Sequence, residues 1–115
     1  MKTYLFIVTL LIIIYYLWNQ TNESCKIYLF YKDQCKYCKE MKTDWESVEN
    51  KLIGTSIKLI SIDANDPKHK KMYNNFNIST VPHIVKVFPD GTRCVYKGER
   101  KCDDIIGWSY ETAYD

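Results

Sequence analysis

The chain lacks the features expected of a metal-binding or nucleic-acid-binding protein. Its 115 residues include five cysteines and two histidines, but only Cys35 and Cys38 form a closely spaced pair. A structural zinc site usually takes four such ligands as two close pairs, so we expect no metal site. The net charge is only +2, and the nearest approach to a basic block, residues 68–71, fits a solvated helix face. We therefore expect no nucleic-acid partner.

Charge is also missing from the stretch Tyr4–Trp18, which is apolar with aromatic residues at both ends. At 15 residues it is slightly shorter than the range of about 17–25 that is usual for a membrane span. The alternative, a cleaved signal peptide, would end on small residues, whereas residues 19–24 are polar and offer no such site. We predict a single-pass membrane anchor over residues 1–18 that enters the membrane through residues 4–18, a polar tether over 19–25 and a folded domain over 26–115.

The charges around this stretch predict on which side of the membrane the domain lies. Lysine and arginine near a span favour the cytoplasmic side. Lys2 precedes the stretch, and residues 19–25 carry Glu23 but no basic residue, although Lys26 and Lys32 follow soon after. We expect a lumenal or extracytoplasmic domain, where an oxidising compartment would set the direction of thiol chemistry.

The one close cysteine pair, Cys35-Lys36-Tyr37-Cys38, lies between a mostly apolar predicted strand, residues 26–31, and a predicted helix, residues 39–51. The helix dipole and free N–H groups at this point favour an anion, so Cys35 should ionise more readily than an ordinary thiol. Lys36 adds a cation that should lower the Cys35 pKa further. We predict that Cys35 attacks disulfides and that Cys38 resolves the mixed disulfide.

The remaining pattern predicts an α/β domain with the order β-α-β-α-β-β-α. Further strands are expected over 57–62, 83–88 and 93–96, with a helix over 66–76 and a last helix from residue 102 or 103. Strands joined through a helix should be parallel, and the hairpin around Pro89-Asp90-Gly91 should be antiparallel. The product is a mixed sheet flanked by helices.

With this order, residues 26–112 resemble the thioredoxin superfamily. The resemblance is carried by the cysteine motif, Asp63 at the end of a strand, Thr80-Val81-Pro82 before the third strand, and the Asp90-Gly91 hairpin. It implies a thioredoxin-like fold in which Pro82 is a cis-proline facing the cysteines. It also implies that Val81 and Pro82 bind substrate, whose chain pairs with the Val81 backbone like an added strand.

The sequence departs from the family at positions that bear on the chemistry. The family's tryptophan before the first cysteine is Gln34, its buried acid is Leu29, and the lysine that partners this acid is Leu59. Apolar residues thus replace both members of a buried ion pair, which is often neutral for stability. The change removes the usual proton acceptor for Cys38, and Lys58 or water would have to take its place.

The leading hypothesis is a membrane-anchored thiol–disulfide oxidoreductase whose redox-active disulfide, Cys35–Cys38, acts on protein thiols and disulfides without a soluble cofactor. A stabilised thiolate favours the reduced form, so an oxidase or isomerase role is expected over that of a strong reductase. The C-x-Tyr-C motif, Thr-Val-Pro and Cys102-Asp103-Asp104 also resemble glutaredoxins, so a glutathione-dependent enzyme is the alternative. The third hypothesis is a non-catalytic thioredoxin-fold adaptor.

The other cysteines and one histidine give weaker signals. Cys94 and Cys102 flank a short strand and turn and are a candidate second disulfide, with a small buried thiol at Cys94 as the alternative. Cys25 is the unpaired one, a candidate for a link to another chain or for acylation. His83 follows Pro82, where it would either tune a nearby thiolate or face solvent.

Overall fold

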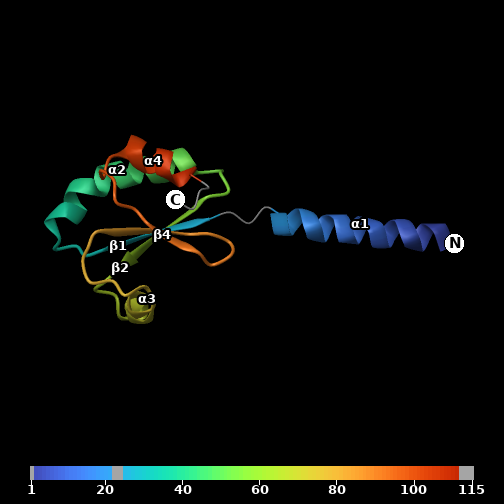
Figure 1. Ribbon diagram of the computed structural model, residues 1–115, viewed down its shortest axis with the longest axis horizontal. Helices are drawn as coiled ribbons and strands as arrows, with labels where there is room; N and C mark the ends of the chain where they lie inside the picture. The colour runs from blue at the N-terminus through green and yellow to red at the C-terminus, as the bar shows by residue number, and fades with distance from the viewer. Residues whose placement is uncertain (1, 22–24, 112–115) are drawn as a thin grey trace.

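The computed structural model describes residues 2–21 and 25–111 (Figure 1). The elements are, in order, α1 (Lys2–Thr21), β1 (Lys26–Tyr31), α2 (Lys36–Leu52), β2 (Lys58–Asp63), the 3₁₀ turn η1 (Pro67–His69), α3 (Lys70–Phe76), β3 (His83–Val87), β4 (Arg93–Val95) and α4 (Cys102–Ser109). From β1 onward this is the predicted β-α-β-α-β-β-α order. The predicted helix over 66–76 differs in one respect, because its first turn is the 3₁₀ turn η1.

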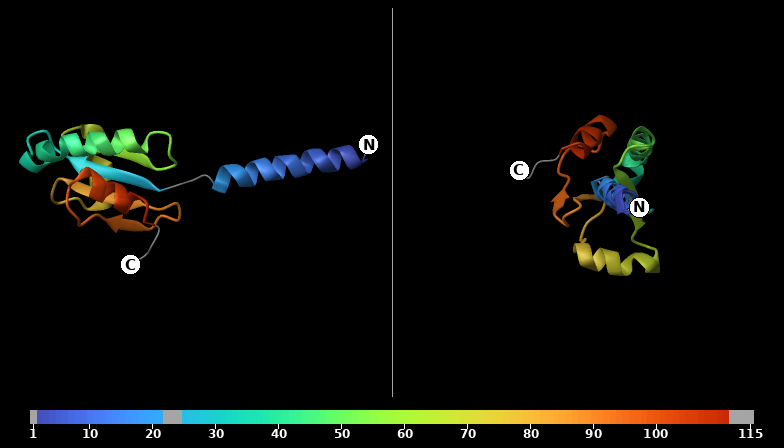
Figure 2. Two further views of the ribbon diagram at one scale, coloured as in Figure 1. Left: turned by 90° about the horizontal axis from the view of Figure 1, so that it is seen from above. Right: turned by 90° about the vertical axis from the view of Figure 1, so that its right-hand side faces the viewer.

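The four strands form one mixed sheet in the order β2-β1-β3-β4. β1 and β2 are parallel, whereas β3 runs antiparallel to both β1 and β4. α2 and α4 lie side by side on one face of the sheet, and α3 covers the other face (Figures 1 and 2). The predicted mixed sheet flanked by helices is therefore confirmed.

β1 is one of the two inner strands of the sheet, and its sequence is suited to that position. Ile27 and Leu29 are buried on the face covered by α2 and α4, whereas Phe30 is buried among the aromatic side chains of the α3 face. A strand covered on both faces favours apolar residues, which matches the apolar run between Lys26 and Lys32.

The sequence of α2 sets both its packing and its ends. The predicted apolar stripe is buried and consists of Met41, Trp45, Val48 and Leu52. Gly54 follows the helix with a φ of +82°, which a glycine adopts without strain, and it allows the chain to turn back into β2. The helix begins at Lys36, three residues before the predicted start, because the Cys35 side chain caps its first turn.

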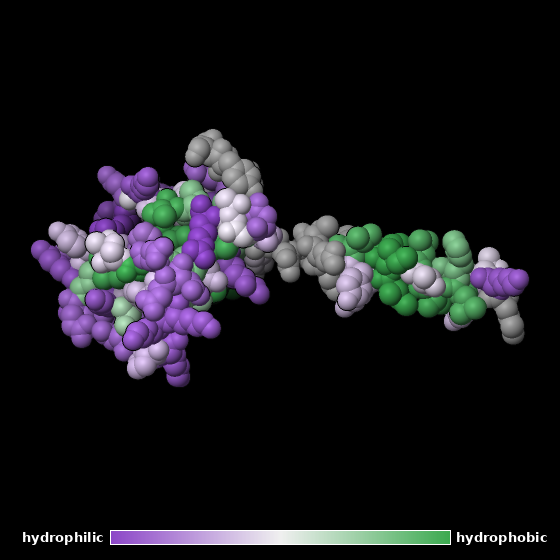
Figure 3. Space-filling model, turned by 60° about the horizontal axis from the view of Figure 1, so that its bottom comes forward, coloured by the Kyte–Doolittle hydropathy of each residue, from purple (hydrophilic) through white to green (hydrophobic). Residues whose placement is uncertain are grey.

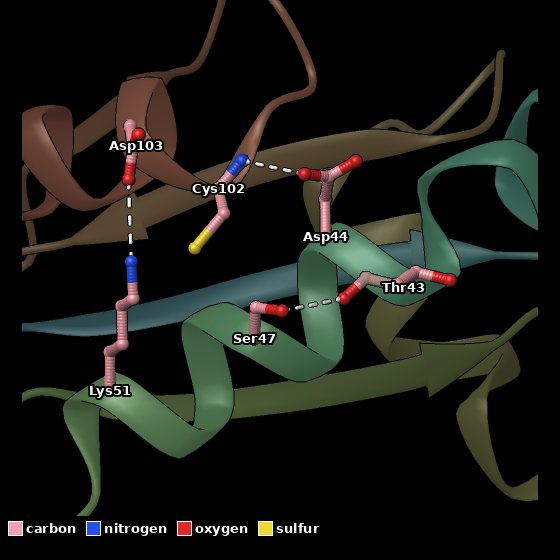
Figure 4. Close-up of polar contacts among 6 residues, drawn as sticks. All are labelled: Thr43, Asp44, Ser47, Lys51, Cys102 and Asp103. Carbon is pink, nitrogen blue, oxygen red and sulfur yellow. Dashed lines mark hydrogen bonds and ion pairs between the residues drawn. The ribbon is translucent and has the colours of Figure 1, made fainter.

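α4 docks beside α2 through polar contacts around a buried apolar centre (Figure 4). The Cys102 backbone N–H donates to Asp44 Oδ1 at 3.0 Å, so a carboxylate from α2 satisfies one of the free N–H groups that begin α4. Lys51 Nζ lies 3.3 Å from Asp103 Oδ1, but both side chains are well exposed and this ion pair adds little stability. The apolar contribution comes from Ile105, which is fully buried.

A buried lysine holds the other end of α4. Lys86 on β3 is only 1% exposed, and its ammonium donates to the carbonyl oxygens of Trp108 and, at 2.9 Å, Glu111. The same ammonium lies 4.5 Å from the centre of the Trp108 ring. These contacts place a cation at the carbonyl oxygens of the C-terminal end of α4, where a positive charge is favoured. Burial lowers the pKa of Lys86.

The N-terminal helix α1 does not fit the predicted membrane anchor. Its apolar part, residues 4–18, would be roughly 22 Å long at the helical rise, against a hydrocarbon core of about 30 Å. Within residues 2–21 and 25–111, no helix has the length and apolar content that a bilayer crossing needs. The predicted single-pass arrangement and the orientation derived from it are therefore wrong, and the predicted membrane contact through residues 4–18 is not shown.

α1 is nevertheless an exposed apolar helix (Figure 3). Leu5 and Phe6, for example, are 68% and 75% exposed. It continues to Thr21, into the segment predicted as a tether, of which residues 22–24 lie outside the described part. Cys25, the last residue of the predicted tether, is buried against the core on the α2 face.

Candidate active site

The first turn of α2 creates two different environments for its two thiols. The chain leaves β1 at Tyr31 and turns, with Cys35 N donating to Lys32 O at 3.2 Å. Cys35 then serves as the N-cap of α2 in an extended conformation, and its Sγ accepts the Cys38 N–H at 3.2 Å. The nucleophile candidate thus lies where the helix N–H groups point.

The surroundings of Cys35 favour its thiolate. Partial burial acts to raise the pKa of Cys35, but hydrogen bonds from Cys38 and from the Tyr37 backbone outweigh it. The positive charge of Arg100 acts in the same direction as these bonds. The net result is a Cys35 pKa below its ordinary value, which makes this thiol the more reactive of the pair near neutral pH.

Cys38 points inward and has the opposite character. It is 8% exposed. Burial, followed by the hydrogen bond with Cys35 and the charge on Cys35, raises the pKa of Cys38 to about 11, although the Lys32 backbone and Arg100 oppose this. A protonated, buried thiol one turn from a stabilised thiolate is the arrangement that a resolving cysteine requires.

The predicted substrate-binding residues lie beside Cys35. The Val81–Pro82 bond is cis, and the Cys35 thiol donates to Val81 O at 3.6 Å. This proximity follows from the sheet, because β3 is antiparallel to β1 and its first residue, His83, pairs with Phe30 near the end of β1. Cys35 and Val81, which are 46 residues apart in the sequence, therefore meet where β1 ends and β3 begins.

Arg100 is a site residue that the sequence analysis missed. It lies in the connection between β4 and α4, and its guanidinium lies 5.5 Å from the centre of the exposed Tyr37 ring. Its charge lowers the pKa of both Cys35 and Cys38. The predicted cation, Lys36, is exposed on the first turn of α2. No local motif marks Arg100, since only the docking of α4 against α2 brings its loop to the cysteines.

Leu29 and Leu59 occupy the positions where the family has a buried acid and its partner lysine, and both contribute to the apolar core. Leu29 is buried, and Leu59 packs against the same core cluster. Lys58, one predicted substitute for the proton acceptor, pairs with Lys26 at the start of β1, whereas Cys38 follows the end of that strand. Five residues of strand separate these ends, roughly 16 Å, so Lys58 does not reach Cys38.

The remaining predicted residues lie apart from the site. The five cysteines all have free thiols in this structure. Cys94 pairs across the sheet with Lys86, and Cys102 begins α4 against α2 (Figure 4). A Cys94–Cys102 disulfide thus stays a prediction. His83 lies with its ring 6.3 Å from that of Phe30, and burial lowers its pKa.

The fold and this pair of thiols define a thioredoxin-like dithiol domain. Residues 18–110 match the thioredoxin family model. The match covers most of the chain, so the chain belongs to the thioredoxin family, as the sequence motifs predicted.

The relatives agree with this assignment. Protein disulfide-isomerase of Hordeum vulgare is 30% identical over 81 residues, which cover 67% of this chain and 16% of that protein. The first thioredoxin domain of mouse protein disulfide-isomerase A4 superposes with a TM-score of 0.65 at 22% identity, covering 77% of this chain and 63% of that one. The J-Trx1 fragment of ERdj5 gives a TM-score of 0.66 at 13% identity, with 75% and 41% covered.

These comparisons set the level at which the assignment holds. The chain spans about a sixth of the length of the curated relative, and the two structural likenesses fall below 25% identity, so they show the fold alone. Together with the family match, they place the chain among domains of the thioredoxin fold that are similar to those of protein disulfide-isomerases.

Proposed function

We propose that this chain is a thiol–disulfide oxidoreductase that exchanges disulfides with protein substrates through Cys35 and Cys38. The observation that carries the proposal is the contrast between the two thiols. Cys35 accepts an N–H at the start of α2 and has a lowered pKa, while Cys38 is buried with a pKa of about 11. This contrast supports an attacking role for Cys35 and a resolving role for Cys38.

In the reductive direction, the Cys35 thiolate attacks one sulfur of a substrate disulfide. A Cys35–substrate bond forms, the substrate S–S bond breaks, and the released substrate sulfur takes a proton from solvent. Cys38 then loses its proton and attacks Cys35 Sγ, which forms the Cys35–Cys38 disulfide and releases the second substrate thiol. Two electrons pass from the cysteine pair to the substrate, and the oxidative direction is the reverse.

Substrate binds beside Cys35 along the Val81 backbone. The Val81 carbonyl already accepts a hydrogen bond from the Cys35 thiol, so it lies at the point where a substrate sulfur must approach. An extended substrate segment that hydrogen-bonds to this backbone would bring its disulfide to Cys35 without a specific side-chain pocket. The cysteine pair itself carries the electrons, and no soluble cofactor is required.

The electrostatics favour oxidation or isomerisation of substrates over strong reduction. Contacts that stabilise the Cys35 thiolate stabilise the reduced protein, which makes its disulfide the better oxidant. The N–H of Cys38 and the charge of Arg100 both act in this direction. The name of the Hordeum vulgare relative, protein disulfide-isomerase, is consistent with this direction.

Trapping of mixed disulfides tests the proposal. In the Cys38→Ser variant, Cys35 attacks but nothing resolves the adduct, so mixed disulfides with a scrambled disulfide-containing protein should accumulate and disappear on reduction. Cys35→Ser should trap none, and the matched control Cys102→Ser, which removes a thiol outside the site, should not accumulate them either. The readout is a non-reducing gel followed by mass spectrometry of the linked cysteine.

The alternatives give different results in the same experiment. Adducts with glutathione but not with the protein substrate would indicate a glutathione-dependent enzyme. The complete absence of adducts in Cys38→Ser would indicate a non-catalytic adaptor. Either result would contradict the proposal.

A further inference from the structure

A cavity of about 370 Å³ lies against Cys38, between α2 and the strands β1 and β2. Three of its lining residues, Leu29, Cys38 and Trp45, are buried, while six charged ones, among them Asp33 and Glu46, are exposed. The cavity therefore leads from the protein surface to the resolving thiol. It is large enough for several water molecules, and the exposed charged side chains of its lining and the Ser61 hydroxyl offer them hydrogen-bond partners.

The chemistry of Cys38 requires such a route. This thiol must lose its proton before it attacks Cys35 Sγ, yet burial and its neighbour hold its pKa at about 11. Two residues of β1 line the cavity: Leu29 accepts no proton, and burial raises the pKa of the Tyr31 phenol, which therefore stays protonated at neutral pH. Lys58 lies at the opposite end of the sheet, since it pairs with Lys26.

We propose that solvent in this cavity is the proton acceptor for Cys38, in place of a buried carboxylate. Ser61 is an exposed residue of β2 that contributes a hydroxyl to the cavity wall: it lies beside Leu29 across the sheet, and its Oγ accepts a hydrogen bond from Trp45 Nε1 at 3.0 Å. This bond fixes the hydroxyl at the cavity wall, where it positions water. The inference rests on the proposed roles of Cys35 and Cys38.

The step balances without a further reactant. The Cys38 S–H bond breaks and its proton passes to water in the cavity and on to bulk solvent. The Cys38 thiolate forms a bond with Cys35 Sγ as the bond between Cys35 and the substrate sulfur breaks. The electron pair of that bond leaves with the substrate sulfur, which is protonated by solvent.

The test follows resolution alone, with 5,5′-dithiobis(2-nitrobenzoate) as the probe. The full chain carries Cys94→Ser and Cys102→Ser to remove the other partly exposed thiols. Attack by Cys35 releases one thionitrobenzoate in a phase that depends on reagent concentration, and attack by Cys38 releases a second in a phase that does not. Stopped-flow absorbance separates the two phases, and Cys38→Ser identifies the first.

Ser61→Phe should fill the cavity and slow the second phase at least about tenfold at neutral pH, since it removes the proton-transfer path. The first phase should stay unchanged. Lys58→Phe is the matched control, because it adds the same ring at an exposed position of β2 away from the cavity, and it should leave both phases unchanged. An unchanged second phase in Ser61→Phe, or an equal loss in Lys58→Phe, would overturn the inference.

A measurement on the chain with an unmodified cavity guards against misfolding of the variant. At constant pH and ionic strength, added imidazole should accelerate the second phase, because a small base enters the cavity and accepts the proton. A second phase independent of imidazole would contradict the inference. Failure of the proposed function looks different, because the first phase would then be absent and no mixed disulfide would form.

Discussion

The two cysteines differ because one helical turn separates them, not because their neighbours in the sequence differ. Cys35 lies outside the first turn, where it accepts the N–H of Cys38, and Cys38 lies inside it, where the side chain meets the core. The motif therefore predicts both roles as soon as a strand and a helix are recognised on either side of it. Val81 and Pro82 were predicted instead through the resemblance to the thioredoxin superfamily, which a Thr-Val-Pro motif at this distance from the cysteines helps to carry.

Arg100 provides a prediction at the residue scale. Arg100→Gln should raise the pKa of Cys35, because the positive charge of Arg100 stabilises the thiolate. The Cys38 pKa should rise as well, since Arg100 lowers both. The measurement is the pH dependence of iodoacetamide labelling at each cysteine.

Lys36→Gln is the matched control for Arg100→Gln, because it removes the same charge from an exposed side chain adjacent to Cys35 in the sequence. Its effect on the Cys35 pKa should be the smaller of the two. A larger shift in Lys36→Gln would show that the cation inferred from the sequence, and not Arg100, stabilises the thiolate.

At the scale of elements, most helices and strands follow from apolar periodicity and turn residues. The stripe from Met41 to Leu52 is such a case, and so is the turn at Gly91, whose φ of +91° suits a glycine. The first residue of a helix is harder to predict when a side chain caps its first turn, as the Cys35 side chain does for α2. The prediction that α1 spans a membrane rested on its apolar, uncharged composition. Such a run indicates a span only when it is also long enough.

Lys86 shows a contact that no element predicts by itself. Its position within an apolar strand gives no reason for a charge, and the reason lies in the end of α4, whose carbonyl groups it binds. Lys86→Met should destabilise the domain by about 1–3 kcal/mol, because the carbonyl oxygens of Trp108 and Glu111 lose a charged donor. Urea unfolding monitored by circular dichroism measures this free energy.

The control for Lys86→Met is Lys58→Met, at an exposed position of β2. Its free energy of unfolding should lie within about 0.5 kcal/mol of the unmodified chain. If the two variants prove equally stable, the carbonyl contacts of Lys86 do not hold α4 in place.

At the scale of the whole molecule, the site is a product of topology. The cysteines follow β1 and Val81-Pro82 precedes β3. Because these neighbouring strands are antiparallel, the two segments lie together at the same end of the sheet. Arg100 comes to this end from the loop before α4, and the cavity beside Cys38 forms between α2 and two strands. Sequence motifs predicted the cysteine pair and Val81-Pro82. The position of Arg100 and the cavity depend on packing between distant segments, and no local sequence signal marks them.

The central claim is that the fold separates the two thiols into a reactive and a protected one. The most direct measurement is the rate of iodoacetamide labelling of the reduced chain against pH, resolved for each cysteine by peptide mass spectrometry. A lowered pKa keeps a thiol ionised at lower pH, so Cys35 labelling should reach half its maximum below the ordinary thiol value of about 8.5. Cys38 labelling should keep rising toward pH 11, in accord with its pKa of about 11. Faster labelling of Cys38 than of Cys35 at neutral pH would contradict the account.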